Sequence, residues 1–312
     1  IKEELHDKYK EKSINILLLN DCNINDVDLT IKQGSFLDAY MNLKNLYPEK
    51  EYKVTELLNA IGFSRSILNN LIKKGVFRIE KRNISRIIAS SDRIIPFNDL
   101  TCFQKGALSK IKESFLDKDV CLLHGVTSSG KTEVYIKLIS QELEKGNQVL
   151  YLLPEIALTT QIINRLKKYF GNKVGVYHSY VNDLERVEVW RSVQDSINSE
   201  LQCQIILGTR SSLFLPFNNL GLIIVDEEHD SSFKQHHVSP RYNARDSAIY
   251  LAKLHNAKVV LGSATPCLES YYNTIKGKYA LVNMNNRFSD IRMPEINIVD
   301  IRKAHLKKKM VM

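Results

Sequence analysis

A short glycine-rich stretch offers the clearest chemistry in this 312-residue sequence. Residues 119–132 read DVCLLHGVTSSGKT, an apolar run followed by the spacing G-x-x-x-x-G-K-T, and an amphipathic stretch begins directly afterwards. A strand, a glycine-bounded loop and a helix are the context that a phosphate-binding loop requires, and a surface Gly/Ser turn lacks it. The loop amides and helix start suit an anion, Lys131 can reach β- and γ-phosphates, and the Thr132 hydroxyl suits Mg²⁺. We therefore predict a nucleoside triphosphate site formed by Gly125, Val126, Thr127, Ser128, Ser129, Gly130, Lys131 and Thr132.

A run of acids supplies the other groups that triphosphate hydrolysis needs. The sequence DEEH follows the apolar strand-like run LIIV, and its first acid, Asp226, is placed to hold Mg²⁺ at the tip of that strand. The next carboxylate, Glu227, is placed to orient and deprotonate an attacking water. An acidic surface turn is the alternative interpretation.

Cations and aromatic residues gather after other predicted strands. LPEIALT (153–159) and GTRSSLF (208–214) carry backbone amides, hydroxyls and Arg210, which suit a phosphodiester backbone. After the acid run, SSFKQHHVSPRYNARD mixes rings with cations, as surfaces that stack unpaired bases do. An ordinary loop is the alternative, although a loop of this length is usually more polar. In this stretch Phe233, His236, His237 and Tyr242 interleave with Lys234, Arg241 and Arg245, and we predict that it contacts nucleic acid.

A histidine and two hydroxyl residues after predicted strands favour a link between the nucleotide site and the nucleic-acid site. His229 has no second His or Cys at metal-ligand spacing, so a hydrogen-bonding link between nucleotide and nucleic acid is favoured over metal binding. The tetrapeptide GSAT at 262–265 ends the last predicted strand, where Ser263 and Thr265 are placed to relay a change at the γ-phosphate. Alone, it fits an ordinary strand-to-helix turn equally well.

Alternating strands and helices must bring these groups together. The runs QVLYLLP, KVGVYHS, CQIILGT, LGLIIVDEEH and KVVLGSA read as strands, with helical patterns at 159–170, 183–198 and 243–254. This alternation predicts an α/β fold, a RecA-like phosphate-loop lobe with a parallel sheet covered on both faces and ligands at the strands' carboxyl ends. Upstream, the Gln104 amide can both donate and accept, which matches the edge of adenine; a plain surface role is the alternative.

A small basic module precedes this lobe. The pattern from Ser35 predicts three short helices, ended by Pro48, Gly62 and Gly75, and VFRIEKRNISRI then alternates like a hairpin around Asn83. Such an arrangement is a winged helix-turn-helix. Lys73, Lys74 and further cations form a strip suited to DNA phosphates. A solvated face on a protein-docking module is the alternative.

Composition sets weaker limits. The net charge of +9 favours a polyanionic partner, and no apolar run approaches the length of a membrane span. The five cysteines include no CxxC pair, which favours a reducing compartment without disulfides and predicts no zinc cluster. The start, IKEELHDKYK, has no initiator Met and no signal core, so we expect a piece of a longer chain.

Together these segments resemble the first motor lobe of superfamily 2 DNA helicases, most closely the primosomal replication-restart helicases (PriA, primosomal protein N′). The stretch from about Leu100 to Asp300 carries the resemblance through GVTSSGKT, LPEIALT, GTRSSLF, DEEHDSSFKQ, PRYNARD, LGSATPCLES and VDIR. The resemblance assigns ATP·Mg²⁺ to Lys131 and Thr132, the metal to Asp226, water activation to Glu227, adenine to Gln104, and DNA coupling to the loop with Phe233, Lys234, Arg241 and Tyr242.

The resemblance implies an ATP-dependent 3′→5′ DNA helicase that remodels stalled or abandoned forks and promotes primosome assembly in the bacterial cytoplasm, at the nucleoid. Its partners would be single-stranded and forked DNA, the single-stranded-DNA-binding protein and other primosome components, with no membrane. A double-strand DNA translocase and a nucleotide-gated DNA-binding scaffold are the alternatives.

The sequence also departs from that family. Its zinc-binding cysteine cluster, second motor lobe and C-terminal domain have no counterpart here, so the family's zinc has no ligands in this chain, and Phe233 stands where tyrosine is expected. Because the second lobe normally supplies an arginine finger, we expect this chain alone to bind DNA, to bind ATP weakly, and neither to hydrolyse ATP appreciably nor to unwind DNA. The expected divisions are a linker or remnant of an N-terminal DNA-binding domain at 1–34, a winged helix at 35–92, a helicase lobe at 93–305 and a connection at 306–312.

Overall fold

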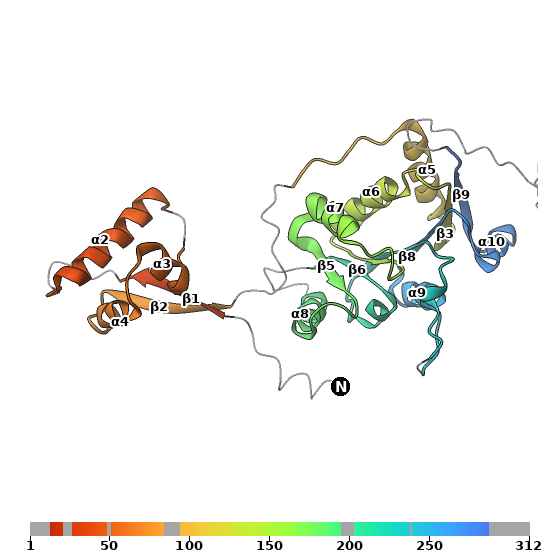
Figure 1. Cartoon of the computed structure of the whole chain (residues 1–312). Coiled ribbons are helices and arrows are strands. Elements are labelled where there is room, and N and C mark those ends of the chain that lie inside the picture. The colour runs from red at the N-terminus through yellow and green to blue at the C-terminus, as the bar shows by residue number, and fades with distance from the viewer. Residues whose placement is uncertain are drawn as a thin grey trace, which may run out of the picture. The chain divides into compact units, whose positions relative to one another are not determined.

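The computed structural model describes residues 13–20, 27–48, 51–83, 94–194, 203–237 and 239–286 (Figure 1). It divides into two compact units, one up to residue 89 and one that comprises most of the chain from residue 90 onward. The expected connection at 306–312, the VDIR segment and the residues predicted to close the wing after Asn83 lie outside the described residues.

The first unit contains the three predicted helices. Their bounds are α2 Ile31–Leu46, α3 Val54–Ile61 and α4 Arg65–Lys73. Helix α2 begins four residues before the predicted start because Thr30 and Gln33 form a capping box there. Helix α3 ends as predicted at Gly62, which adopts the left-handed conformation that glycine tolerates (φ 71°).

A two-stranded antiparallel sheet completes this unit. Strand β1 (Ser13–Leu19) pairs with β2 (Phe77–Asn83) over their whole length, from Ser13 opposite Asn83 to Leu19 opposite Phe77. The predicted division at residue 34 places β1 outside the winged helix, and the sequence predicts a hairpin around Asn83, the last residue of β2. The structure pairs β2 with a strand distant in the sequence, because Leu17 and Phe77 both enter the core of the helical unit, and the second arm of the predicted hairpin lies outside the described residues. The division at residue 34 therefore separates two strands of one sheet.

That core is built on edge-to-face aromatic contacts. Phe77 packs against Phe36 and Tyr40, with ring centroids 5.8 and 5.0 Å apart, and Phe36 also contacts Phe63 at 5.5 Å. Phe36 and Phe77 are almost completely buried. Aromatic pairs of this geometry stabilise a core beyond the burial of their area.

The second unit is an α/β lobe with a seven-stranded parallel sheet, as predicted. The strand order is β5-β6-β4-β7-β8-β3-β9. The bounds are β3 Val120–Gly125, β4 Gln148–Leu152, β5 Val174–Tyr177, β6 Ile205–Gly208, β7 Leu220–Asp226, β8 Lys258–Ser263 and β9 Ala280–Met284. The sequence took the strand ending at GSAT as the last one; that was wrong, since β9 follows it. Strand β9 lies at the sheet edge, with every second residue exposed, so it lacks the continuous apolar run of its neighbours.

Helices cover both faces of this sheet. They are α5 Cys102–Ser114, α6 Lys131–Glu144, α7 Thr160–Phe170, α8 Asp183–Gln194, α9 Ala244–His255 and α10 Leu268–Ile275, with short 3₁₀ turns η2 Gly171–Lys173, η3 Arg210–Phe214 and η4 Ser231–Phe233. Helices α5, α6 and α7 bury one apolar face of the sheet, and α9 and α10 lie against the other (Figure 1). Within the described ranges, no helix has the length and apolar character needed to cross a membrane.

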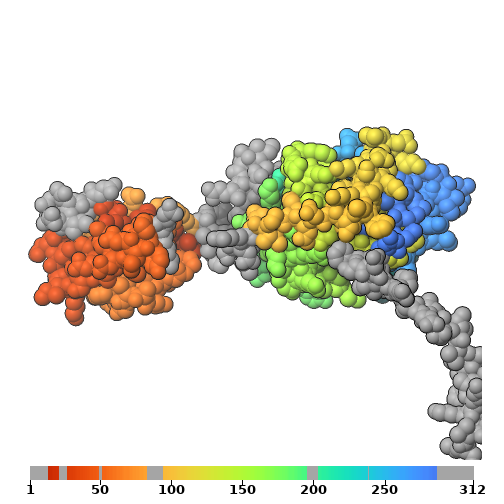
Figure 2. Space-filling model, turned by 90° about the horizontal axis from the view of Figure 1, so that it is seen from above, coloured from red at the N-terminus to blue at the C-terminus, as the bar shows by residue number. Residues whose placement is uncertain are grey.

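Residues 94–100, which precede α5, are packed onto this lobe. The Ile95 N–H donates to the Lys168 carbonyl at 3.0 Å, and Phe97 stacks on Tyr169 with centroids 5.5 Å apart. The Lys137 ammonium lies 4.8 Å from the Phe97 ring. Figure 2 shows this orange-yellow strip lying along the lobe.

We predict that Phe77→Ala destabilises the first unit by about 3–5 kcal/mol, because it removes a ring packed against two others. Ile79→Ala is the matched control, since Ile79 is on the same strand but 38% exposed. Urea unfolding followed by circular dichroism should show a transition moved to lower urea for Phe77→Ala alone. Equal behaviour of the two variants would contradict the assigned core.

Candidate nucleotide site and adjoining nucleic-acid surface

The phosphate loop lies between the end of β3 at Gly125 and the start of α6 at Lys131. Gly130 has φ 82°, and a Cβ there would lie 2.2 Å from the Gln104 Nε2 atom. A Cβ on Gly125 would lie 2.8 Å from the Ser129 Oγ atom. Glycine is therefore favoured at 130 by the left-handed backbone and at 125 by the close approach of Ser129.

The loop has groups suited to an anion. The Lys131 ammonium is buried and donates to the Gly125 carbonyl at 2.9 Å. The Ser129 hydroxyl is buried and has no hydrogen-bond partner among the described residues. Buried polar groups are normally paired, so an orphaned hydroxyl in a loop at a helix start fits a phosphate ligand.

Gln104 is used within the protein. Its Oε1 atom accepts from the Thr101 N–H at 2.9 Å in the capping box that starts α5, and its Nε2 atom donates to the Gly130 carbonyl at 3.4 Å. The side chain therefore braces the phosphate loop. Its role as a reader of adenine stays a prediction.

Asp226 is held by two tyrosines that the sequence did not predict. Tyr135 of α6 donates to Asp226 Oδ1 and Tyr151 of β4 donates to Oδ2, each at 3.1 Å. Burial raises the pKa of Asp226, the neighbouring Glu227 charge raises it further, and Lys131 and the two tyrosines oppose this shift. Burial, followed by the charge of Asp226, raises the pKa of both tyrosines well above the ordinary value.

Lys131 and Asp226 converge at one edge of the sheet. Strands β3 and β7 flank β8, all three are parallel, and both residues come at or just after a carboxyl end. The Lys131 charge lowers the pKa of Asp226, as this convergence implies. Among the described residues, no three His, Cys, Asp or Glu side chains gather as a metal site of their own. Mg²⁺ usually takes one or two carboxylates plus phosphate oxygens, so Asp226 and Thr132 fit it together with a nucleotide.

The predicted coupling residues are also brought together. His229 Nδ1 lies 2.8 Å from the Ser263 hydroxyl, which also accepts from the Thr265 N–H at 2.9 Å. The Glu227 carboxylate lies 3.6 Å from the same His229 nitrogen. Glu227 has φ 49°, an unusual value for a residue with a side chain, and such conformations concentrate at functional sites.

Glu228, the third residue of DEEH, has a structural role that the sequence analysis missed. Its side chain is completely buried and accepts from Arg245 at 3.2 Å, from Ser270 at 2.9 Å and from the Cys267 N–H at 2.8 Å. Because Arg245 belongs to the stretch PRYNARD and Cys267 to TPCLES, this carboxylate ties three sequence motifs together. The available sequence signal was an acid close to the end of an apolar strand, because such an acid, if buried, needs a partner such as an arginine elsewhere in the chain.

Four residues form a partly exposed aromatic and basic cluster beside the acid run, with Lys234 and Phe214 exposed and Arg210 and Tyr242 half-buried. The Arg210 guanidinium donates to the Lys234 carbonyl at 3.1 Å and lies 3.6 Å from Glu155. Tyr242 meets Phe214 edge to face with centroids 5.3 Å apart. The sequence predicted Arg210, Lys234 and Tyr242 but missed Phe214, which is 67% exposed.

Phe233 does not lie on this surface, and its predicted stacking on bases is wrong for this structure. Its ring is only 1% exposed, within the 3₁₀ turn η4. The turn directs the ring into the lobe and leaves Lys234 exposed, together with Arg241 beyond it. An aromatic residue between polar neighbours was mistaken for a surface ring.

In the first unit, the two predicted lysines differ. Lys73 is exposed at the end of α4. The Lys74 ammonium donates to Gln33 at 3.0 Å and to the Asp28 carbonyl, so it secures the segment before α2. Lys73 is the better candidate for a phosphate contact.

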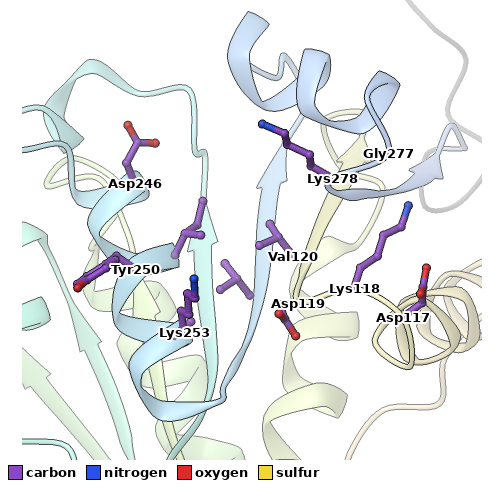
Figure 3. Close-up of a pocket in the computed structure, with 12 residues that line it drawn as sticks. Asp117, Lys118, Asp119, Val120, Asp246, Tyr250, Lys253, Gly277 and Lys278 are labelled. Atoms are coloured by element: carbon purple, nitrogen blue, oxygen red, sulfur yellow. The ribbon is translucent and has the colours of Figure 1, made fainter.

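A cavity of about 580 Å³ lies at the other edge of the lobe. Figure 3 shows Val120 and the residues before it facing Tyr250 and Lys253 of α9. Residues 117–120 of the cavity lining come before or at the start of β3, whereas the phosphate loop follows the end of β3. The cavity is thus separate from the predicted site.

Comparisons with known proteins agree with this arrangement. A family model for the DEAD/DEAH box helicase matches residues 101–274, and one for the winged helix domain of PriA helicase in Bacteroidota matches residues 23–84. The chain is 41% identical over 253 residues to the replication restart protein PriA of Bacillus subtilis. That match covers 79% of this chain and 30% of the relative. The chain is 41% identical over 263 residues to that of Synechocystis (83% and 31%) and 46% identical over 205 residues to that of Rickettsia prowazekii (66% and 30%). The chain thus spans about 30% of the length of these curated relatives.

We predict that Asp226→Asn raises the melting temperature of the ligand-free protein at neutral pH. The pKa of Asp226 is raised in the folded state, so its contribution to the free energy of unfolding is greatest below the ordinary value of 3.8 and falls as the pH rises through the raised pKa. Asparagine carries no charge and avoids that loss. Thermal unfolding at several pH values should show a higher melting temperature for Asp226→Asn than for the wild type at pH 7, and this difference should narrow toward pH 4. A loss of stability at pH 7 would contradict the burial cost assigned to Asp226.

Proposed function

Because the chain belongs to the DEAD/DEAH box helicase family, we propose that it provides the ATP-binding lobe and winged helix of an ATP-dependent DNA helicase that acts in replication restart. One observation carries the proposal. The phosphate loop and the DEEH strand tip share the sheet edge beside which Arg210, Lys234, Tyr242 and Phe214 form a partly exposed cluster. A nucleotide and a nucleic acid then bind neighbouring loops of one lobe.

The residues of the lobe divide the chemistry among them. The loop amides, Ser129 and Lys131 bind the phosphates, and Lys131 exchanges the Gly125 carbonyl for a phosphate oxygen. Asp226 and Thr132 would hold Mg²⁺, which when bound neutralises charge on the β- and γ-phosphates. Glu227 orients the attacking water and accepts its proton.

The hydrogen bonds around His229 provide a route from this chemistry toward the nucleic acid. His229 contacts both Glu227 and Ser263, and Ser263 also accepts from the backbone of Thr265. A change at the γ-phosphate that moves Glu227 would alter the His229–Ser263 bond. We propose these residues as the coupling elements.

The finer activity is proposed from the resemblance. It comprises 3′→5′ unwinding at stalled forks, primosome assembly with single-stranded-DNA-binding protein and other components, and action in the cytoplasm at the nucleoid. We further propose that the exposed Lys73, Arg78 and Lys81 of the winged helix contact DNA phosphates. The same resemblance implies that hydrolysis needs an arginine from a second lobe. We therefore expect this chain alone to bind nucleotide and DNA but to hydrolyse ATP negligibly.

Nucleotide binding by the printed chain tests the proposal. Titration with a fluorescent ATP analogue and Mg²⁺ should show saturable binding that Lys131→Ala weakens at least about tenfold, since a charged phosphate contact is lost. Lys145→Ala, at the exposed far end of α6, should bind like the wild type. The proposal fails if Lys131→Ala binds as well as the wild type. Robust DNA-stimulated hydrolysis in a single-turnover assay would refute the expected inactivity.

The nucleic-acid surface makes a separate prediction. Lys234→Ala should weaken single-stranded DNA binding and reduce the steepness of log affinity against log salt by about 0.7, because one phosphate contact is removed. Lys253→Ala, on α9 beside the cavity at the opposite edge, should change neither quantity. Fluorescence anisotropy at several salt concentrations measures both. Equal effects of the two variants would contradict this placement of the DNA.

A further inference from the structure

The carboxylate of Asp226 is gripped from three segments of the lobe. Its Oδ1 atom accepts from the Tyr135 hydroxyl at 3.1 Å and from the Glu227 N–H at 3.2 Å, and its Oδ2 atom accepts from the Tyr151 hydroxyl at 3.1 Å. Tyr135 lies in α6, which begins at the phosphate loop, and Tyr151 lies in β4. The carboxylate is thus fastened to the helix that follows the loop and to a neighbouring strand.

These donors leave one direction open. An ionised carboxylate has about four lone-pair sites, two on each oxygen. Oδ1 has two donors and Oδ2 has one, and no further donor to either atom occurs among the described residues. The remaining site is on Oδ2. A cation that approaches Asp226 without displacing a protein donor must therefore bind Oδ2.

The tyrosines themselves have little freedom. Both rings are completely buried and meet edge to face, with centroids 5.7 Å apart. A carboxylate torsion on its own is broad, so two hydroxyls fixed in this way determine its orientation.

The GSAT segment explains how Tyr135 is accommodated. A Cβ at Gly262 would lie 1.7 Å from the Tyr135 hydroxyl oxygen and 3.1 Å from Asp226 Oδ1. Any larger residue at this position would displace the hydroxyl. Gly262 therefore makes room for the contact between Tyr135 and Asp226.

We propose that Tyr135 and Tyr151 are positioning residues that aim Oδ2 of Asp226 at the magnesium ion bound with the nucleotide. The inference rests on the proposed function and deepens it. Removing a hydroxyl would let the carboxylate rotate and weaken its metal contact. Groups that orient metal ligands typically contribute about 10- to 100-fold in metal affinity or activity.

Tyr135→Phe and Tyr151→Phe test the inference, since phenylalanine keeps the buried ring and removes only the donor. Tyr169→Phe is the matched control, a buried tyrosine on the same face of the sheet without contact to Asp226. The printed chain is titrated with Mg²⁺ at a fixed concentration of fluorescent ATP analogue, and again with the analogue in EDTA. Melting temperatures confirm that each variant is folded.

We expect the Mg²⁺ concentration for half-maximal binding to rise about tenfold in Tyr135→Phe and Tyr151→Phe, with affinity in EDTA unchanged. Tyr169→Phe should match the wild type. A purely structural role would weaken binding in EDTA and in Mg²⁺ alike, and that outcome, or an unchanged Mg²⁺ requirement, overturns the inference. If the wild type shows no Mg²⁺-dependent binding, the proposed function itself fails.

Discussion

The hydrogen bonds to the Asp226 carboxylate are the constraint on which the nucleotide site depends. The carboxylate at the tip of this central strand is half-buried, and donors and a nearby cation stabilise its charge there. Tyr135, Tyr151 and the Glu227 N–H are the donors, and Lys131 is the cation. Tyr135 and Lys131 come from α6, Tyr151 comes from β4, and Glu227 directly follows β7. The fold therefore fixes the spacing between phosphate loop and acid before any ligand binds.

The acid run divides into binding and structural roles. Asp226 and Glu227 face the proposed site, whereas Glu228 is buried and pairs with Arg245 while it also accepts from Ser270. A buried pair of this kind contributes little net stability but is costly to break, so it fixes the packing of α9 and α10 on the sheet. The left-handed backbone at Glu227 lets adjacent acids point in different directions.

Much of this arrangement could be predicted from the sequence because the signals are local. The parallel sheet followed from apolar runs and the phosphate loop from glycine spacing, whereas the contact between His229 and Ser263 was not predicted, only a linking role for each of them. Contacts between distant segments were not predictable: the pairing of β1 with β2 and the two tyrosines at Asp226 depend on the tertiary fold. The burial of Phe233 was missed because a single ring in a polar loop carries no period that shows its direction.

The most direct test is a crystal structure of this chain with Mn²⁺ and a non-hydrolysable ATP analogue, in which anomalous scattering locates the metal. The account predicts one metal peak beside the phosphates, between the Thr132 hydroxyl and Oδ2 of Asp226, with both tyrosine hydroxyls still on the carboxylate. A metal bound through Oδ1, or a nucleotide bound at the opposite edge of the sheet near Asp119, would contradict it.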